Sequence, residues 1–100
     1  MVRTDAARSC ALALPGCTEE DHHGRPSFRV CGRIFATLWT PRLMNVMVEE
    51  GRVMAAVEEH PRSCEVVRWG SRIAAVRVDL DAADPGLLAD LLEAAWEFKR

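Results

Sequence analysis

The chain has 100 residues, of which 49% are hydrophobic and 28% are charged, and its formal net charge at pH 7 is −2. This balance excludes a disordered or fibrous chain, and the length supports one hydrophobic core, so we expect a single domain over residues 1–100. The apolar runs are far shorter than the roughly 18 residues that cross a bilayer, and no secretory signal opens the chain. We therefore expect a cytoplasmic protein without a membrane span, with four free cysteines.

The N-terminal segment predicts a helix. Apolar and small residues recur at spacings of three and four over Asp5–Ala13, with Thr4 as a candidate N-cap. Pro15 and the glycine after it end this helix. The polar segment Thr18–Gly24 that follows is expected to be a connection.

Three strands are expected next. Ser27–Cys31 and Ile34–Trp39 are rich in β-branched and aromatic residues and flank Gly32, which predicts a hairpin. Over Leu43–Val48, Met44, Val46 and Val48 alternate with Leu43, Asn45 and Met47, which predicts a third strand. Consecutive strands joined by such short turns favour an antiparallel sheet.

The second half predicts a helix, two strands and a helix. Glu49–His60 has one apolar side, and strands are expected around Glu65–Arg68 and over Ile73–Leu80. Asp84 as N-cap and Pro85 at the first helical position begin the last helix, whose apolar residues share one face. We therefore predict an α+β two-layer sandwich of order α-β-β-β-α-β-β-α, in which helices cover one face of an antiparallel sheet of about five strands.

Charge is distributed unevenly along the chain. The residues from His22 to Val48 include four arginines and no carboxylate, whereas those from His60 to Val78 include four arginines and only Glu65 as an acid. The carboxylates gather on the predicted helices. Arginine suits bidentate contacts with phosphate or carboxylate, although arginines also simply solubilise a wet sheet face.

The candidates for metal binding and catalysis are weak. His22 and His23 are adjacent and lack the spacing of convergent metal ligands. Cys31 or Ser27 could be paired with a histidine, but no known catalytic motif fixes such a pair. We expect no catalytic residue, no metal and no cofactor, and a structural role for the two histidines at the entry to a hairpin.

Three tryptophans are the large aromatic residues. Trp96 lies on the apolar stripe of the last helix and is expected in the core. Trp39 and Trp69 lie at strand ends, where core packing is the favoured role and partial exposure the alternative. An exposed tryptophan beside arginines can stack on a base or hold a small apolar ligand.

Several motifs resemble the MmcQ/YjbR family of small bacterial proteins. They are LPG at Leu14–Gly16, HHGRPSF at His22–Phe28, RVCGRIFATLW at Arg29–Trp39, WG at Trp69–Gly70 and a final helix ending in AW at Ala95–Trp96. The resemblance covers nearly the whole chain and is densest from Leu14 to Trp39. The individual positions that match are His23, Gly24, Pro26, Ser27, Phe28, Gly32, Phe35, Trp69 and Gly70.

This resemblance implies the two-layer fold that secretion chaperones and frataxin-like (CyaY-like) proteins share, which agrees with the predicted order. It also implies DNA binding through a double wing of hairpins. Two positions depart from many relatives: Arg33 stands where they have lysine, and the chain ends at Arg100 where they often continue with a basic tail.

Two hypotheses of function follow. The first is a non-enzymatic DNA-binding protein, a monomer or small homo-oligomer, whose arginines contact phosphates while aromatic residues add contact area. Its candidate site residues are Arg25, Arg29, Arg33, Arg68, Arg72, His23, Trp39 and Trp69. The alternative is a small-molecule or protein binder, such as one that sequesters a metabolite or toxin. It would use the same arginines to bind an anionic or planar group, with Phe28, Trp39 and Trp69 near a pocket.

Overall fold

Helices and strands follow one another in the order α-β-β-β-β-α-β-β-α in a computed structural model that describes all 100 residues. The elements are α1 (Thr4–Leu12), β1 (Thr18–His22), β2 (Arg25–Val30), β3 (Arg33–Thr40), β4 (Leu43–Val46), α2 (Glu50–Glu59), β5 (Cys64–Trp69), β6 (Arg72–Asp79) and α3 (Pro85–Lys99). None of the helices is long and apolar enough to span a membrane.

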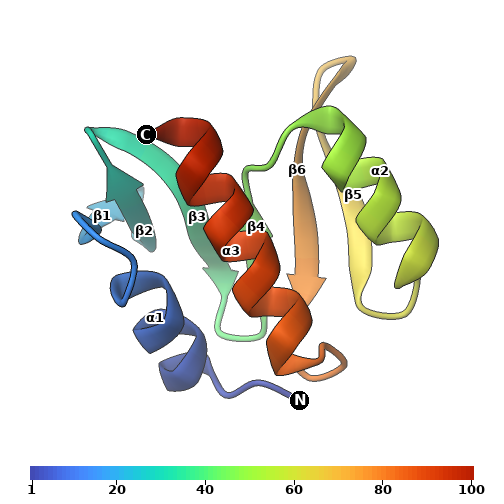
Figure 1. Cartoon of the computed structure of the whole chain (residues 1–100), viewed down its shortest axis with the longest axis horizontal. Coiled ribbons are helices and arrows are strands. Elements are labelled where there is room, and N and C mark those ends of the chain that lie inside the picture. The colour runs from blue at the N-terminus through green and yellow to red at the C-terminus, as the bar shows by residue number, and fades with distance from the viewer.

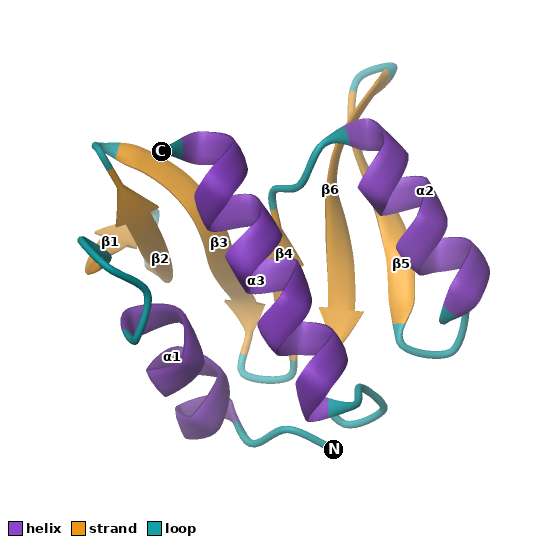
Figure 2. Cartoon of the chain, in the orientation of Figure 1, coloured by secondary structure: helices purple, strands orange, loops and turns teal.

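The six strands form one antiparallel sheet in the spatial order β1-β2-β3-β4-β6-β5. The helices lie on one face of it, in front of the strands in Figure 1 and coloured purple in Figure 2. The opposite face points away from the viewer in both figures. The predicted fold class and element order are therefore confirmed, but the sheet has six strands where about five were expected.

The additional strand is β1, in the segment that the sequence predicts to be a connection. All five of its residues are exposed, and it pairs only with β2, from Thr18 opposite Arg29 to His22 opposite Arg25. The prediction was wrong because an exposed edge strand has no buried face and hence no apolar alternation. The Ser27 hydroxyl, on β2, donates to the Glu20 carbonyl at 2.7 Å and helps to hold this edge.

Two-residue turns join β1 to β2 and β2 to β3. His23 and Gly24 have φ of 53° and 84°, and Cys31 and Gly32 have 52° and 75°. Positive φ at both central residues defines the type I′ turn, whose twist matches that of the flanking strands. The predicted hairpin at Gly32 is confirmed, and the two histidines stand at the entry to a hairpin, as expected.

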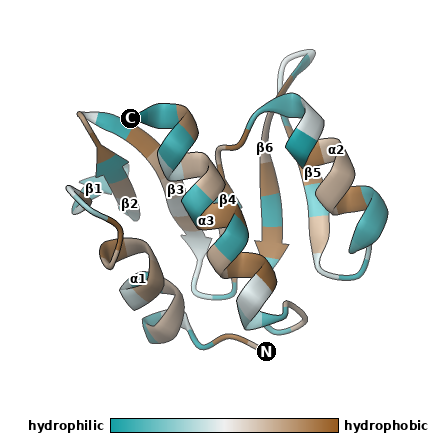
Figure 3. Ribbon diagram, viewed as in Figure 1, coloured by the Kyte–Doolittle hydropathy of each residue, from teal (hydrophilic) through white to brown (hydrophobic).

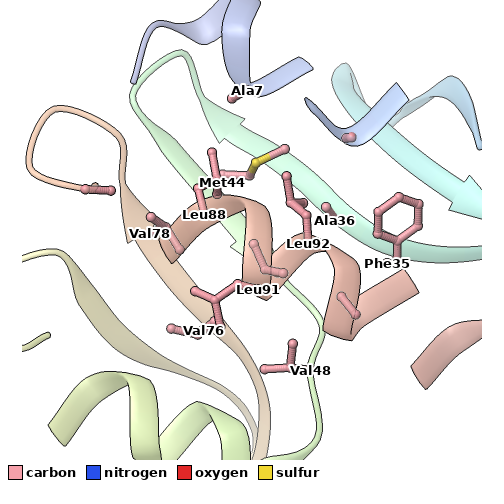
Figure 4. Packing of buried hydrophobic residues seen from close by; sticks show 14 of the residues in the cluster. Ala7, Phe35, Ala36, Met44, Val48, Val76, Val78, Leu88, Leu91 and Leu92 are labelled. Atoms are coloured by element: carbon pink, nitrogen blue, oxygen red, sulfur yellow. The ribbon is translucent and has the colours of Figure 1, made fainter. Parts of the chain in front are cut away.

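The core lies between α3 and the covered face of the sheet. In Figure 4, Leu88, Leu91 and Leu92 of α3 lie over Met44 and Val76 of the central strands. Figure 3 shows the alternation of apolar and polar residues along α3.

Asp84 caps this helix as predicted, since its carboxylate accepts from the amides of Gly86 and Leu87 at 3.0 and 3.3 Å.

The first helix differs from its predicted bounds by one residue at each end. Thr4 is its first residue and Arg3 its N-cap, so the prediction of Thr4 as the cap was wrong. The Thr4 hydroxyl instead donates to the carbonyl of Pro41, in the turn between β3 and β4. Because this partner is 37 positions away along the chain, the residues around Thr4 could not predict the bond.

The contribution of α3 can be measured with Leu92→Ala. Leu92 is fully buried, so truncation should lower the free energy of unfolding by about 2–5 kcal/mol, because it removes apolar contacts and leaves a cavity. Urea denaturation followed by circular dichroism measures the loss. Leu12→Ala is the matched control, since Leu12 is 40% exposed and its truncation should cost under about 1 kcal/mol. Equal losses in the two variants would contradict the proposed core.

Candidate ligand-binding recess on the open sheet face

The face of the sheet that no helix covers contains a recess of about 580 Å³. Residues of all six strands form its floor and sides, β1 through His22 alone, together with the β1–β2 turn and the C-terminal end of α3. The lining residues are His22, His23, Arg25, Arg33, Ile34, Thr37, Trp39, Asn45, Met47, Val67, Trp69, Arg72, Ala74, Arg77 and Lys99.

Irregularities in strand pairing shape this face. Phe35 and Trp39 are extra residues in β3, between successive pairs with β2 and β4, and Ala74 is an extra residue in β6. Such β-bulges bend a strand and increase its twist, and they change the direction of the side chains beside them. Trp39, itself in a bulge, lies on the recess and is 39% exposed.

The recess is lined by positive charge. Five cationic side chains contribute to it and no carboxylate does; the cations are Arg25, Arg33, Arg72, Arg77 and Lys99. Several carboxylates gather on the helical side of the molecule, where a groove is lined by Glu49, Asp90, Glu93 and Glu97 together with Arg52. The cationic recess and this acidic groove lie on different parts of the molecule, but the sheet is not basic throughout, because its edge strand β1 carries Glu19, Glu20 and Asp21.

Trp39 lies close to two arginines, Arg25 on the neighbouring strand β2 and Arg77 on β6, which is two strands away. The Arg25 guanidinium carbon lies 3.8 Å from the centroid of the indole ring, and the Arg25 Nε donates to the Trp39 carbonyl at 2.8 Å. The guanidinium carbon of Arg77 lies 5.3 Å from the same ring. Cation–π contacts of this kind orient the indole and leave the arginines with further donors for a ligand.

Arg77 is also bound to the floor of the recess. Its Nε donates to the Oδ1 atom of Asn45 at 2.9 Å, and one of its terminal nitrogens lies 3.8 Å from a carboxylate oxygen of Glu65. Asn45 and Thr37 are polar and almost fully buried on the same face. Together these groups place hydrogen-bonding capacity at the centre of the recess.

The structure brings six of the eight predicted site residues together. Arg25, Arg33, Arg72, His23, Trp39 and Trp69 all line the recess. Arg29 and Arg68 do not. Arg29 lies toward the β1 edge, where its Nε donates to the Ser27 hydroxyl and lies 3.9 Å from a Glu20 oxygen. Arg68 stands between Val67 and Trp69, which line the recess, and alternation along the strand directs it elsewhere.

Several of the residues that line the recess were not predicted from the sequence. Thr37, Asn45, Arg77 and Lys99 belong to the recess, and of these only Thr37 lies in one of the family motifs, at a position not singled out as a match. Arg77 and Asn45 had a usable signal, since each alternates with core residues on a predicted strand, Arg77 between Val76 and Val78 and Asn45 between Met44 and Val46. Phe28, by contrast, was expected near a pocket and is fully buried in the core.

The tryptophans divide between the two sides of the molecule. Trp69 is 60% exposed at the rim of the recess, so the expectation of core packing was wrong for Trp69 and Trp39. Trp96 packs against the core as predicted, and its indole N–H donates to the Pro15 carbonyl at 2.8 Å. The sequence around an aromatic residue at the end of a strand is similar whether its side chain faces the core or the solvent. Its exposure is decided by the pairing register of the strand.

The cysteines are free and dispersed. Burial raises the pKa of the thiols of Cys10, Cys17 and Cys64, which therefore stay protonated at neutral pH and are weak nucleophiles. Cys31 is exposed in the β2–β3 turn. No three histidine, cysteine or acidic side chains converge as metal ligands.

Comparison with known proteins agrees with the fold and with the motifs. No curated protein matches the chain. The crystal structure of Deinococcus radiodurans protein DR2400, with the domain DUF419, superposes with a TM-score of 0.80 at 24% identity, covering 98% of this chain and 78% of that one. This likeness shows the same fold. The sequence pattern of the YjbR family matches residues 12–98, and the chain therefore belongs to the YjbR family.

Proposed function

We propose that this protein is a non-enzymatic binding protein that holds a planar, anionic small molecule in the recess on its open sheet face. The observation that carries the proposal is the lining itself, in which two tryptophans and five cationic side chains meet without a carboxylate. Aromatic faces favour planar groups, and cations without competing acids favour a negative ligand.

The size and composition of the recess fit a small molecule. Its volume of about 580 Å³ lies within the range of roughly 300–1,000 Å³ that is usual for small-molecule sites. Apolar side chains supply part of the floor, through Ile34, Met47, Val67 and Ala74, so the surface is suited to more than phosphate contacts. Sequestration of an aromatic metabolite or toxin would need this combination of apolar contact and charge.

The proposal predicts that planar anions bind and that a rim tryptophan contributes. Isothermal titration with 2-naphthoate and 2-naphthyl phosphate should detect binding, whereas the neutral 2-naphthol should bind much more weakly. Trp69→Ala should weaken anion binding about tenfold, because stacking on an aromatic side chain is worth about 1–3 kcal/mol. Met54→Ala, which truncates a 45% exposed side chain on α2, should leave binding unchanged. If neither anion binds at millimolar concentration, the proposed function fails.

DNA binding is the second candidate, and a separate observation favours it. Arg33 and Arg72 are exposed at the beginnings of β3 and β6, directly after hairpin turns, and both are on the rim of the recess. Arg68 is exposed on the second of these hairpins. Projecting cationic hairpins can contact phosphates on either side of a strand whose bases lie against Trp39 and Trp69.

Salt dependence tests this candidate. If DNA binds, the affinity for a labelled oligonucleotide should fall steeply as salt rises, because phosphate neutralisation releases counterions. Replacing Arg33 and Arg72 by glutamine should reduce the slope of log K against log salt by about 1 for each phosphate that is no longer neutralised. Arg52→Gln on α2 removes one charge outside the recess and is the control for each of the two single replacements. Fluorescence anisotropy with single- and double-stranded DNA makes the measurement, and no binding at micromolar protein in low salt would reject DNA as the ligand.

A further inference from the structure

The floor of the recess contains a straight polar row across the sheet. Ser27 stands opposite Thr37, Thr37 opposite Asn45, and Asn45 opposite Arg77, on four neighbouring strands. Residues in register on adjacent antiparallel strands point to the same face. We call Thr37, Asn45 and Arg77 the floor row, because these three line the recess.

Two members of the floor row are polar, deeply buried and free to bind a ligand. Thr37 is 6% exposed and Asn45 is 4% exposed, and both line the recess. A guanidinium only donates, so the bond from the Arg77 Nε fixes Oδ1 of Asn45 toward the arginine and turns the amide nitrogen away from it. Neither that nitrogen nor the Thr37 hydroxyl has a partner within the chain. Both donors therefore stay available to an acceptor that enters the recess, and each such hydrogen bond contributes about 0.5–1.5 kcal/mol.

Arg77 adds charge to these donors. Its Nε is engaged by Asn45, which leaves the two terminal nitrogens for a ligand. The competing acid is Glu65, whose oxygen is 3.8 Å away, and because its side chain is 66% exposed, against 23% for Arg77, solvent weakens this pair. The floor row therefore presents a hydroxyl, an amide N–H and a guanidinium, a set that matches acceptors carrying a single negative charge.

An apolar row lies beside the floor row. Met47, Val67 and Ala75 form a small buried cluster on the open face, with Ile34 packed against it. Ala75 is two residues along β6 from Arg77, and Met47, one residue beyond the end of β4, is two residues from Asn45, which corresponds to about 7 Å in extended chain. A ligand that covers both rows needs an acceptor group at one end and an apolar, flat portion about 7 Å away.

We propose that the ligand class is aromatic carboxylic acids, with the carboxylate on the floor row and the ring system over the apolar row. This assignment rests on the proposed function and specifies its ligand. A carboxylate is planar, carries one charge and matches the two terminal nitrogens of Arg77. A phosphate monoester carries about −1.5 to −2 charges, and Arg77 is the one cation of the floor row, so the second charge would be desolvated without a partner there.

The first test compares ligands that differ only in the polar group. Isothermal titration with 2-naphthoate, 2-naphthamide and 2-naphthyl phosphate should show that the carboxylate binds at least about tenfold more tightly than the other two, a factor worth about 1.4 kcal/mol. In ¹⁵N-edited NMR spectra the side-chain amide of Asn45 should shift with 2-naphthoate. Tighter binding of the phosphate, or an unperturbed Asn45 amide, would overturn the assignment.

The second test changes the floor row while keeping the fold. Asn45→Asp retains an acceptor for Arg77 but replaces the free donor by a negative oxygen, and should weaken 2-naphthoate binding at least about tenfold. Thr37→Val, which preserves shape, should weaken it about threefold or more and serves where the aspartate variant does not fold. The control Arg52→Gln should bind as the wild type does.

These outcomes separate the ligand class from the proposed function. If anions bind and Trp69→Ala weakens them, but Thr37→Val and a folded Asn45→Asp both bind 2-naphthoate like the wild type, the ligand assignment is wrong and the binding function stands. If no naphthyl anion binds, the proposed function itself is wrong, and the assignment falls with it.

Discussion

The packing of α3 against the central strands, together with α1 and α2, covers one face of a six-stranded sheet and leaves the other face without a covering layer. Because side chains alternate along a strand, each core residue such as Val76 or Val78 forces its neighbour, here Arg77, onto the open face. Because no helix covers the open face, its polar and apolar side chains must be paired and packed by contacts between the strands themselves. Hydrogen bonds such as Arg77 to Asn45 and a small apolar cluster around Met47 achieve this, and they also form the floor of the recess.

The recess depends on departures from regular pairing. The bulges at Phe35, Trp39 and Ala74 lie in the two strands that contribute most to the open face, and each disturbs the alternation beside it. Phe35 and Ala36 both enter the core as a result, and Ile34 can join the apolar cluster on the opposite face. A regular strand would have placed these neighbours on alternate faces.

Electrostatics distinguishes the two layers. The net charge of −2 hides a cationic recess and an acidic helical face. Opposite faces of opposite sign orient an approaching anion toward the sheet, and the effect weakens as salt rises. The absence of carboxylates from the lining matters more for binding than the total charge, because among the recess cations only Arg77 has an acidic partner, Glu65 at 3.8 Å.

The local features of this protein are encoded within a few residues each and were predictable from the amino-acid sequence. They include the Asp84 cap, the apolar stripe of α3, the hairpin turn at Gly32, the order of elements apart from β1, the family motifs and the clustering of arginine on the strands. Which of these arginines lie close together depends on the folded sheet. The floor row of Thr37, Asn45 and Arg77 forms only when neighbouring strands pair in register, and its Asn45 to Arg77 bond joins residues 32 positions apart. A single residue of bulge or shift exchanges the faces of a strand, so cross-strand pairing, and not composition, selected Arg77 for the recess and left Arg68 outside it.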